Sequence, residues 1–330
     1  MTQPEIKDMT IDVSILIVNW NTVDMLYNCL ESVYKETSGI KFEVIVIDNA
    51  SSDKSVEMVR EKFPDVILIE NEVNCGFAAA NNQGLEIAQG RYALLLNSDT
   101  VVLENAIAKT YTFAEANSEA AVVGCRVLNS DRKIQSSCFM FPSILNLCLS
   151  STYLYKLFPR NRFFGRELLT WWDKNSINEV DCVSGCYMLV RKDAIDQAGV
   201  MDERFFMYFE ETDWCYRFKK YGWKTLFTPE AEIIHLGGGS AEQVPVKMTL
   251  LLKGSMLLFF KKHNGILIYI AACLLIALFF FIRIPYWLLM SFSSQKDKKR
   301  KCLQTAYSYI LGTWYALTGG RGLYKLGRVK

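Results

Sequence analysis

Residues 92–100 read YALLLNSDT, an apolar run that ends abruptly on Asn97, Ser98 and Asp99. The apolar residues predict a buried strand, and the three polar residues stand at its carboxyl end. Asn, Ser and Asp are all good turn formers, so one interpretation is a turn and nothing more. The alternative is that Asp99 holds a metal ion over a diphosphate, and the polar ends of the neighbouring strands favour it.

Upstream of this strand, the chain alternates short apolar runs with segments of helical spacing. Such alternation predicts an α/β fold with a mostly parallel central sheet and helices on both of its faces. The expected strands are 13–20, 42–50, 66–71 and 91–100, and the expected helices between them are 23–36, 51–63 and 77–90.

The other expected strands also end on polar groups: Asn19 ends the first, Asp48 lies near the end of the second, and residues 71–74 follow the third. Ligands of open α/β sheets bind at these ends, so Asn19 and Asp48 are candidates for contacting a nucleotide. The chain has neither a GxGxxG loop after its first strand nor a GxxxxGK[ST] motif. A bound phosphate therefore needs another counter-charge, and a divalent metal that bridges it to a carboxylate supplies one.

Six longer motifs carry a more specific signal. They are SILIVNWNTVDMLYNCLESV (14–33), EVIVIDNASSDKSVEMV (43–59), NCGFAAANNQG (74–84), LLLNSDT (94–100), FFMYFEETDWCYRFKKYGW (205–223) and IIHLGGGS (233–240). In this order the motifs, which extend over about residues 12–240, resemble those of family 2 glycosyltransferases with the GT-A fold. The resemblance is strongest to the rhamnosyltransferase-like branch of that family.

The resemblance implies a site for a nucleotide sugar. Asp48 matches the aspartate that contacts the base, and a carboxylate can accept the imide N–H of uracil or thymine, which favours a pyrimidine donor. The structural alternative is that Asp48 caps the next helix. Asn74, Gly76, Asn81 and Asn82 match the stretch that lines the nucleotide pocket. Many relatives have Arg where Asn81 stands, which puts part of the diphosphate contact in doubt.

The motif NSD stands where the family carries its DXD metal motif. The resemblance implies that Asp99 is the metal ligand and that Asn97, in place of the first Asp, contacts the ribose or a metal-bound water, with Ser98 between them. In some members a His in the place of His235 completes the metal site, although a structural role is the alternative. Mg²⁺ or Mn²⁺ suits the oxygen ligands and would bind together with the donor diphosphate.

The motif YFEETDWCYR (208–217) holds the implied chemistry. The family usually has Glu-Asp where this chain has Glu210 and Glu211, and the second acid is the catalytic base. Glu211 inherits that role, and Asp213 is its rival. The family reaction inverts the anomeric centre by direct displacement, which needs one general base for the acceptor hydroxyl. Without the resemblance, three acids in four residues are more typical of an exposed first turn of a helix.

The acceptor side of the site is expected around Glu210, Gly185 and Trp172. Gly185 lies in VDCVSGCYMLVRK (180–192), which resembles the strand that lines the acceptor side in the family, and a glycine there allows close approach of a substrate. Trp172 could stack on a sugar ring, although large aromatic residues more often pack in a core.

Charge divides the chain into an acidic body and a basic appendage. Residues 1–245 carry 23 basic and 34 acidic side chains, whereas residues 246–330 carry 14 basic side chains and one acidic, Asp297. We expect a GT-A domain in 1–245, with a nucleotide-sugar half at about 12–125 and an acceptor half at about 126–245. The basic residues surround an apolar segment, which favours membrane lipids as partners and argues against nucleic acid.

That apolar segment is 266–292, whose 27 residues carry only one charge, Arg283. As a helix it is roughly 40 Å long, enough to cross a bilayer with tilt. Basic residues flank both ends, which suits a re-entrant or interfacial segment, bent near Pro285, better than one clean span. The Tyr-, Trp- and Lys-containing residues that follow predict an interfacial tail. The stretch MTQPEIKDMT shows no secretory signal, so we expect the body at the cytoplasmic face of the membrane.

The residues and the resemblance together imply an inverting, metal-dependent enzyme that transfers one sugar from a nucleotide diphosphate donor to a lipid-linked or cell-surface glycan. The rhamnosyltransferase-like branch implies dTDP-rhamnose as donor, and a UDP-sugar is the alternative within the same fold. A non-catalytic, membrane-tethered scaffold is the alternative from another class, on the grounds that Asn97 and Glu211 depart from the family motifs. A processive polysaccharide synthase would be expected to carry a QxxRW motif, which the chain lacks.

Overall fold

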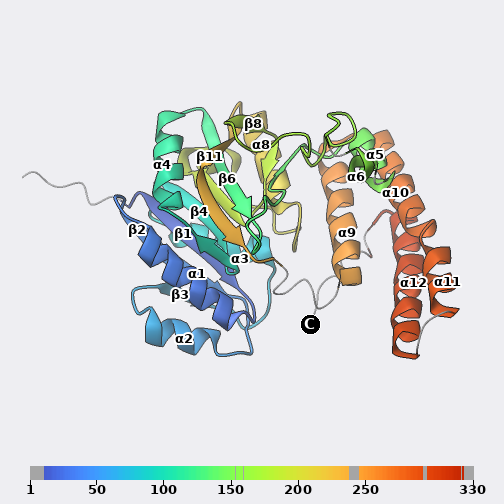
Figure 1. Ribbon diagram of the computed structural model, residues 1–330, viewed down its shortest axis with the longest axis horizontal. Coiled ribbons are helices and arrows are strands. Elements are labelled where there is room, and N and C mark those ends of the chain that lie inside the picture. Colours follow the sequence, from blue (N-terminus) through green and yellow to red (C-terminus); the bar gives the residue numbers. More distant parts are fainter. Residues whose placement is uncertain are drawn as a thin grey trace, which may run out of the picture.

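The expected strands form the centre of one large sheet. The structure, a computed structural model, describes residues 11–152, 154–158, 160–237, 245–292, 296–320 and 322. Within these ranges the sheet has the strand order β3-β2-β1-β4-β10-β6-β11-β5, with β8 beside β11, and a small second sheet pairs β7 with β9 (Figure 1). The strands are β1 (Val13–Asn19), β2 (Phe42–Asp48), β3 (Ile67–Glu70), β4 (Tyr92–Asn97), β5 (Thr100–Val102), β6 (Ala120–Leu128), β7 (Cys138–Phe139), β8 (Asn178–Val180), β9 (Cys182–Val183), β10 (Tyr187–Arg191) and β11 (Lys224–His235).

The sheet is mixed rather than mostly parallel. β1 pairs in parallel with β2 and β4, and β2 with β3, because the helices between these strands return the chain to the same end of the sheet. β10, which follows a long connection, runs antiparallel to both of its neighbours, β4 and β6. β11 is parallel to β6 and antiparallel to β5 and β8. The α/β fold is confirmed. The parallel pairs of the sheet are those among β1, β2, β3 and β4 and the pair of β6 with β11.

Helices cover both faces of the sheet, as the sequence predicts. Along β1, Ile15 and Ile17 belong to a core cluster shared with α1, α2 and α4, whereas Leu16 belongs to a cluster shared with α3, α7 and α8. The helices are α1 (Val23–Glu36), α2 (Ser55–Lys62), α3 (Phe77–Ile87), α4 (Ala106–Ala116), α5 (Ile144–Thr152), α6 (Leu154–Leu157), α7 (Lys192–Ala198), α8 (Glu210–Lys220), α9 (Pro245–His263), α10 (Ile266–Phe281), α11 (Ile284–Phe292) and α12 (Lys296–Leu317).

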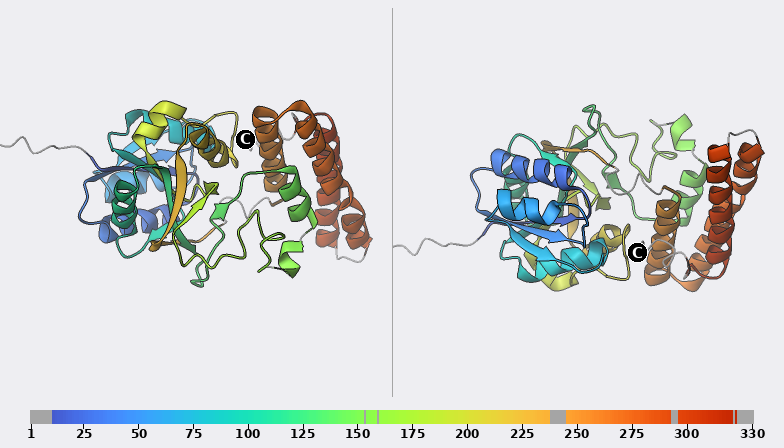
Figure 2. Two further views of the ribbon diagram at one scale, coloured as in Figure 1. Left: turned by 90° about the horizontal axis from the view of Figure 1, so that it is seen from above. Right: turned by 90° about the horizontal axis from the view of Figure 1, so that it is seen from below.

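Helices α9 to α12 stand beside the α/β body and pack on one another (Figures 1 and 2). Their buried apolar residues form a third core cluster, which also contains Phe205 and Phe209 of the body and Leu147 of α5. The boundary expected near residue 245 therefore lies between two stretches of sequence that share one core.

The apolar segment 266–292 forms two helices, α10 and α11, with a break at Ile282 and Arg283 next to Pro285. Within the described part of the chain, α10 and α11 together form one stretch, Ile266–Phe292, that is long and apolar enough to cross a membrane. α12 runs antiparallel to α10: the hydroxyl of Tyr269 donates to the carbonyl oxygen of Gly319 over 2.8 Å. Residues 238–240 of the motif IIHLGGGS and residues 323–330 of the expected interfacial tail lie outside the described residues.

Candidate active site

A cavity of about 400 Å³ opens at the carboxyl ends of β1 and β4. The residues that follow β1, β2 and β4 form part of its wall, and the starts of α3 and α8 and one side of α9 form the rest. Nine of the residues expected from the sequence line it: Asn74, Gly76, Asn97, Ser98, Asp99, Gly185, Glu210, Glu211 and His235.

Asp99 and His235 come together because β11 ends against β5, with His235 opposite Thr100. His235 Nε2 lies 3.2 Å from Asp99 Oδ1 and 3.2 Å from Asn97 Nδ2. On the other side of the ring, His235 Nδ1 lies 2.8 Å from Gln135 Oε1. An amide oxygen can only accept, so Nδ1 donates to Gln135, and Nε2 points towards Asn97 and Asp99.

This pair of side chains fits a divalent cation. A carboxylate oxygen suits Mg²⁺ or Mn²⁺, and an imidazole nitrogen adds a ligand that a first-row transition metal accepts. No third His, Cys, Asp or Glu gathers with them in the part of the chain that the structure describes. Such an ion would therefore need oxygen ligands from a bound donor and from water.

Glu210 and Glu211 enter the cavity from the first turn of α8. The two residues before them, Tyr208 and Phe209, have φ of 67° and 71°. This left-handed conformation costs a non-glycine residue of order 1–3 kcal/mol and persists only where the surrounding structure enforces it. Phe209 is held in the third core cluster, so packing fixes the sharp turn that brings the two carboxyl groups to the cavity.

The two glutamates differ in how their environment changes their acidity. Burial raises the pKa of Glu211 from 4.5 to about 7. Burial, together with the charge of Glu211, raises the pKa of Glu210 well above its ordinary value. Glu210 Oε2 has no hydrogen-bond partner among the described residues. The cavity thus holds one carboxyl group able to accept a proton near neutral pH and one whose environment favours its protonated form.

Asp213 does not line the cavity. Its fully buried carboxylate lies between α8 and α9, 2.9 Å from Arg217 Nε, 2.7 Å from Lys262 Nζ and 2.7 Å from His263 Nε2. Burial opposes its charge, but hydrogen bonds from His263 and Lys262 hold the pKa of Asp213 below its ordinary value. Residues two apart on a helix face different sides, so the expectation of Asp213 as a rival base does not agree with the structure.

Asn19 and Asp48 lie buried beneath the cavity rather than in its lining. Asn19 Nδ2 donates to Asp48 Oδ1 (2.9 Å), and the Ser51 amide donates to Asp48 Oδ2 (2.8 Å) in the loop before α2. Asp48 does not cap α2, whose N-cap residue is Lys54, so the capping alternative does not agree with the structure. Thr22 Oγ1 lies 2.7 Å from Asn19 Oδ1 and 2.9 Å from the hydroxyl of Ser98. These bonds hold the ends of β1 and β2 against the NSD turn, and a contact between Asp48 and a base stays a prediction.

The turn before α3 allows two backbone segments to meet beside the cavity. Gly76 has φ +88°, and a Cβ there would lie 2.4 Å from the carbonyl oxygen of Phe206. That oxygen accepts from the amide of Phe77 over 2.8 Å. Asn74 Oδ1 accepts from Asn49 Nδ2 and from the Gly76 amide, both over 3.0 Å. Only glycine lets the loop before α8 approach the start of α3 in this way.

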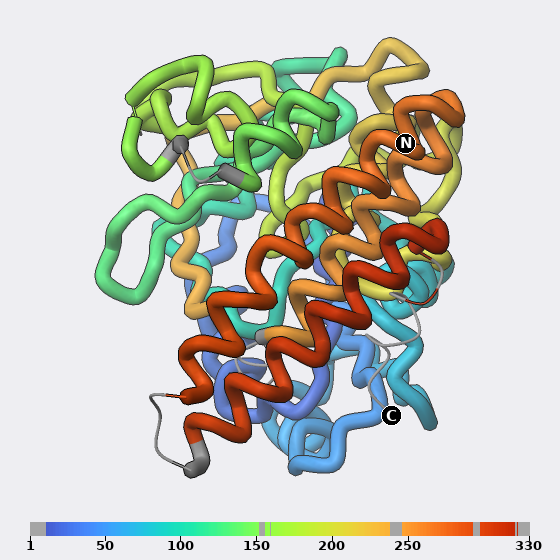
Figure 3. The backbone as a smooth tube through the Cα atoms, turned by 90° about the vertical axis from the view of Figure 1, so that its right-hand side faces the viewer, coloured from blue at the N-terminus to red at the C-terminus, as the bar shows by residue number. Residues whose placement is uncertain are grey.

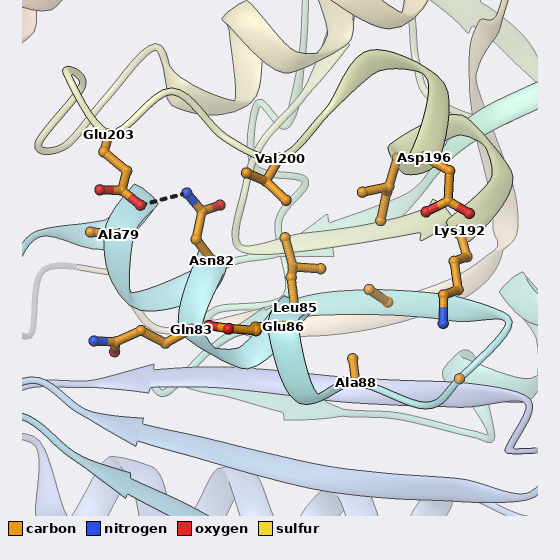
Figure 4. A pocket seen from close by; sticks show the side chains of 13 residues that line it. Ala79, Asn82, Gln83, Leu85, Glu86, Ala88, Lys192, Asp196, Val200 and Glu203 are labelled. Carbon is orange, nitrogen blue, oxygen red and sulfur yellow. Dashed lines mark hydrogen bonds between the residues drawn. The ribbon is translucent and has the colours of Figure 1, made fainter.

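Asn81 and Asn82 lie on α3 but outside this cavity. Asn81 is buried, and its Nδ2 donates to the Phe77 carbonyl oxygen over 2.9 Å. Asn82 lines a second cavity of about 430 Å³ between α3 and α7, where its side chain bonds the backbone of Met201 and the carboxylate of Glu203 (Figure 4). Asn82 holds α3 against the segment after α7, whereas Asn81 bonds within α3 itself. The expected role of both in the nucleotide site does not agree with their positions.

Gly185 and Trp172, both expected on the acceptor side, lie apart. Gly185 lines the cavity beside Ser184. Trp172 packs edge-on against Phe227, with ring centroids 4.8 Å apart, and its Nε1 donates to Ser176 over 3.1 Å. Trp172 is therefore a core residue, in agreement with the alternative that large aromatic residues more often pack in a core. The aromatic residues that line the cavity instead are Trp20, Phe77, Phe206 and Tyr208.

Sequence reasoning missed residues that only the fold brings to the cavity. Gln135 contacts His235 from a loop before β7, and Met248 and Leu251 complete the wall from α9. No local motif marks these three, because their positions depend on strand pairing and on helix packing. Asn49 also lines the cavity, and its place directly after β2 gives it the same polar strand-end signal as Asp48, by which the sequence does indicate it.

Residues 14–169 match the model of the family described as glycosyl transferase family 2. The chain is 26% identical over 237 residues to the N-acetylglucosaminyl-diphospho-decaprenol L-rhamnosyltransferase of Mycobacterium tuberculosis, a match that covers 67% of this chain and 76% of that protein. It is 26% identical over 219 residues to the low-salt glycan biosynthesis hexosyltransferase Agl10 of Haloferax volcanii, covering 65% of this chain and 64% of that protein.

Two solved structures are similar in fold. The mannosyltransferase PcManGT from Pyrobaculum calidifontis, in complex with GDP-Man and Mn²⁺, aligns with a TM-score of 0.56 at 13% identity over 95% of this chain and 86% of that one. GalNAc-T7 with UDP, GalNAc and Mn²⁺ aligns with a TM-score of 0.53 at 16% identity over 70% of this chain and 44% of that one. These likenesses show a GT-A type fold. The family match over residues 14–169 and the curated relatives support a family 2 glycosyltransferase that is similar to rhamnosyltransferases.

Proposed function

We propose that the chain transfers one sugar, rhamnose from dTDP-rhamnose, with inversion to a lipid-linked glycan at the cytoplasmic face of a membrane. One observation carries the proposal: Asp99 with His235, and Glu210 with Glu211, line the same cavity at the strand ends. The sequence-similar protein of Mycobacterium tuberculosis is named as an L-rhamnosyltransferase of a diphospho-decaprenol acceptor, which supports the donor sugar and the acceptor class.

Asp99 and His235 are the residues that would hold Mg²⁺ or Mn²⁺. When bound, the ion neutralises negative charge on the nucleotide diphosphate as it leaves. Gln135 accepts from His235 Nδ1 and thereby keeps Nε2 available as a ligand. Asn97 lies beside both ligands, where it can hold a metal-bound water or the ribose. The Mn²⁺ in both structures of similar fold supports this assignment.

Glu211 is the proposed base. It takes the proton of the acceptor hydroxyl while the acceptor oxygen forms its bond to the anomeric carbon and the bond to the nucleotide diphosphate breaks. Because the oxygen attacks from the face opposite the leaving group, the anomeric centre inverts. Burial and the charge of Glu211 favour the protonated form of Glu210, whose carboxyl group can donate a hydrogen bond to a sugar hydroxyl on the acceptor side.

The first test is the binding of dTDP and of UDP, measured by titration calorimetry with Mn²⁺ and with a chelator. We expect dTDP to bind only in the presence of Mn²⁺. Removing a residue that only orients a metal ligand lowers metal affinity by roughly 10- to 100-fold. Asp99 is itself the proposed ligand, so Asp99→Ala should weaken dTDP binding by more than that.

The matched control is Asp65→Ala, which removes an exposed carboxylate before β3 and should leave binding unchanged. Tighter binding of UDP would instead favour a UDP-sugar donor. Binding that ignores both the chelator and Asp99→Ala would remove the basis for the metal site. A chain that binds dTDP but neither transfers nor hydrolyses dTDP-rhamnose would be the non-catalytic scaffold.

The raised pKa of Glu211 predicts the pH dependence of transfer. A general base works only when ionised, so kcat/KM should fall about tenfold per pH unit below a pKa of about 7. The measurement is the pH profile of kcat/KM for sugar transfer, with dTDP affinity measured at the same pH values as the control. An ascending limb centred near 4.5, the ordinary value for Glu, would contradict the assignment of Glu211.

A further inference from the structure

The outward side of helices α10, α11 and α12 is apolar and exposed. On α10 and α11 it includes Leu267, Leu278 and Leu289, which are 79%, 52% and 69% exposed. On α12 it includes Tyr307 and Trp314, which are 62% and 63% exposed. We propose that this side, called here the apolar plate, lies flat on a membrane that contains anionic lipid, so that α10 and α11 run along the membrane surface and do not cross it.

The plate follows from the spacing of the residues. Along α12 the exposed residues include Tyr307 and Trp314, whereas Ala306 and Ala316 are buried against the neighbouring helices. Apolar residues thus occupy both sides of the same helix, and only one side is covered by protein. A continuous exposed apolar surface of this kind marks a site of contact with a membrane or another protein.

The position of α9 explains why the helices lie flat. α9 packs on the body along its length: Leu251 lines the active-site cavity, Phe259 stacks edge-on with Tyr216, and His263 contacts Asp213. α10 folds back from the end of α9 and shares its core cluster. A bilayer core is roughly 30 Å thick, so α10 could cross it only if α9 and part of the body entered it as well.

Figure 3 shows the same relation from the side of the plate. α10, α11 and α12 extend diagonally across one face of the molecule, with α9 and the body behind them. The helices therefore cover the body as a layer and do not project from it.

Charge selects an anionic membrane as the partner of the plate. Lys298, Lys299, Arg300 and Lys301 are exposed at the start of α12, and Lys261 is exposed at the end of α9. Basic residues beside an apolar helix face attract anionic lipid head groups.

The one charge inside segment 266–292 turns away from the plate. Arg283 donates to the carbonyl oxygens of Phe279 (2.8 Å) and Ser151 (3.2 Å), and its guanidinium lies 3.7 Å from the centroid of the Phe279 ring. The break between α10 and α11 therefore anchors the plate to α5 and leaves its outward side apolar.

This inference rests on the membrane association in the proposed function and adds the orientation of the chain. The first experiment is flotation of the full chain with vesicles of phosphatidylcholine and phosphatidylglycerol, and with vesicles of phosphatidylcholine alone. We expect stronger binding to the anionic vesicles. Leu274→Glu with Leu278→Glu should reduce binding by at least about tenfold, because both side chains are exposed on the plate.

The matched control places two glutamates on exposed apolar positions of the body, Ile67→Glu with Ile177→Glu, and should bind vesicles like the unchanged chain. Titration with dTDP and Mn²⁺ separates the two proposals, since the plate variant should still bind nucleotide. If the plate variant floats like the unchanged chain, or if the unchanged chain forms a dimer through the plate and ignores vesicles, the inference is wrong.

A second experiment distinguishes a flat orientation from a span. Gly265→Cys lies before α10, with no atom within 4 Å of its Cβ. Lys298→Cys lies after α11, at the start of α12, so the two positions stand at opposite ends of the segment that would span. The chain is bound to sealed vesicles and treated with a membrane-impermeant maleimide, with the unchanged chain as background because its cysteines are buried or half-buried. We expect both positions to react equally without detergent. Protection of Lys298→Cys until detergent is added would show a span and overturn the inference.

Discussion

Replacing Glu211 by Gln is expected to lower kcat for sugar transfer by about 10²- to 10⁴-fold, the range that a general base contributes. Gln has nearly the same shape but cannot take the proton of the acceptor hydroxyl. Burial already brings the pKa of Glu211 to about 7, so the amide removes a group whose proton affinity suits the reaction. The measurement is steady-state transfer with dTDP-rhamnose, together with calorimetric affinity for dTDP.

Two further variants serve as controls for this prediction. Glu211→Asp keeps the carboxylate and shortens it by one methylene, so it should retain much more activity than Glu211→Gln. Glu210→Gln keeps a donor in place of the protonated acid, so it should affect binding of the acceptor more than proton transfer. Near-normal turnover of Glu211→Gln, with dTDP still bound, would show that another group is the base.

Asp213→Asn is expected to lower the free energy of unfolding by about 3–5 kcal/mol, the cost of removing one partner from a buried ion pair. The Asn side chain fits the same space but removes the buried carboxylate that Arg217 and Lys262 share between α8 and α9. Lys262 keeps its second partner, Asp202. Urea denaturation followed by circular dichroism measures the change, and transfer activity is assayed at a temperature where the variant is folded.

The double variant Asp213→Asn with Lys262→Met should lose less stability than the sum of the two single changes, because the two side chains are in direct contact. Asp131→Asn, which breaks an exposed pair with Lys133, should leave unfolding unchanged. If Asp213→Asn unfolds like the unchanged chain but no longer transfers sugar, Asp213 acts on the substrate and its structural role is wrong.

The first half of the fold was predictable from sequence because its short apolar strands alternate regularly with segments of helical spacing. Helix α1 was expected at 23–36 and is Val23–Glu36, and β1 differs from expectation by one residue at its end. β10 was different: it occupies a place in the middle of the sheet that is set by tertiary packing, and no local pattern shows which way it runs. The expectation of a mostly parallel sheet failed for that reason.

The site was predictable where a motif and a strand end coincide, as at Asp99 and Glu211. It was not predictable where a side chain finds its partner far along the chain. The sequence could not decide whether Glu211 or Asp213 is the base. Lys262 and His263, the partners that bury Asp213, lie on α9, which the sequence assigns to the basic appendage. Trp172 and Asn82 were misplaced in the same way, since each is held by contacts with distant residues.

The two-sided packing of α9 has a practical consequence for anyone who wishes to prepare a soluble enzyme. Truncation after residue 245 would expose Phe209, open the wall that Leu251 contributes, and remove Lys262 and His263, two of the three basic side chains that contact Asp213. The catalytic body is therefore not an excisable domain. A soluble form is better made by placing polar residues on the outward side of α10 and α12 while every helix is kept.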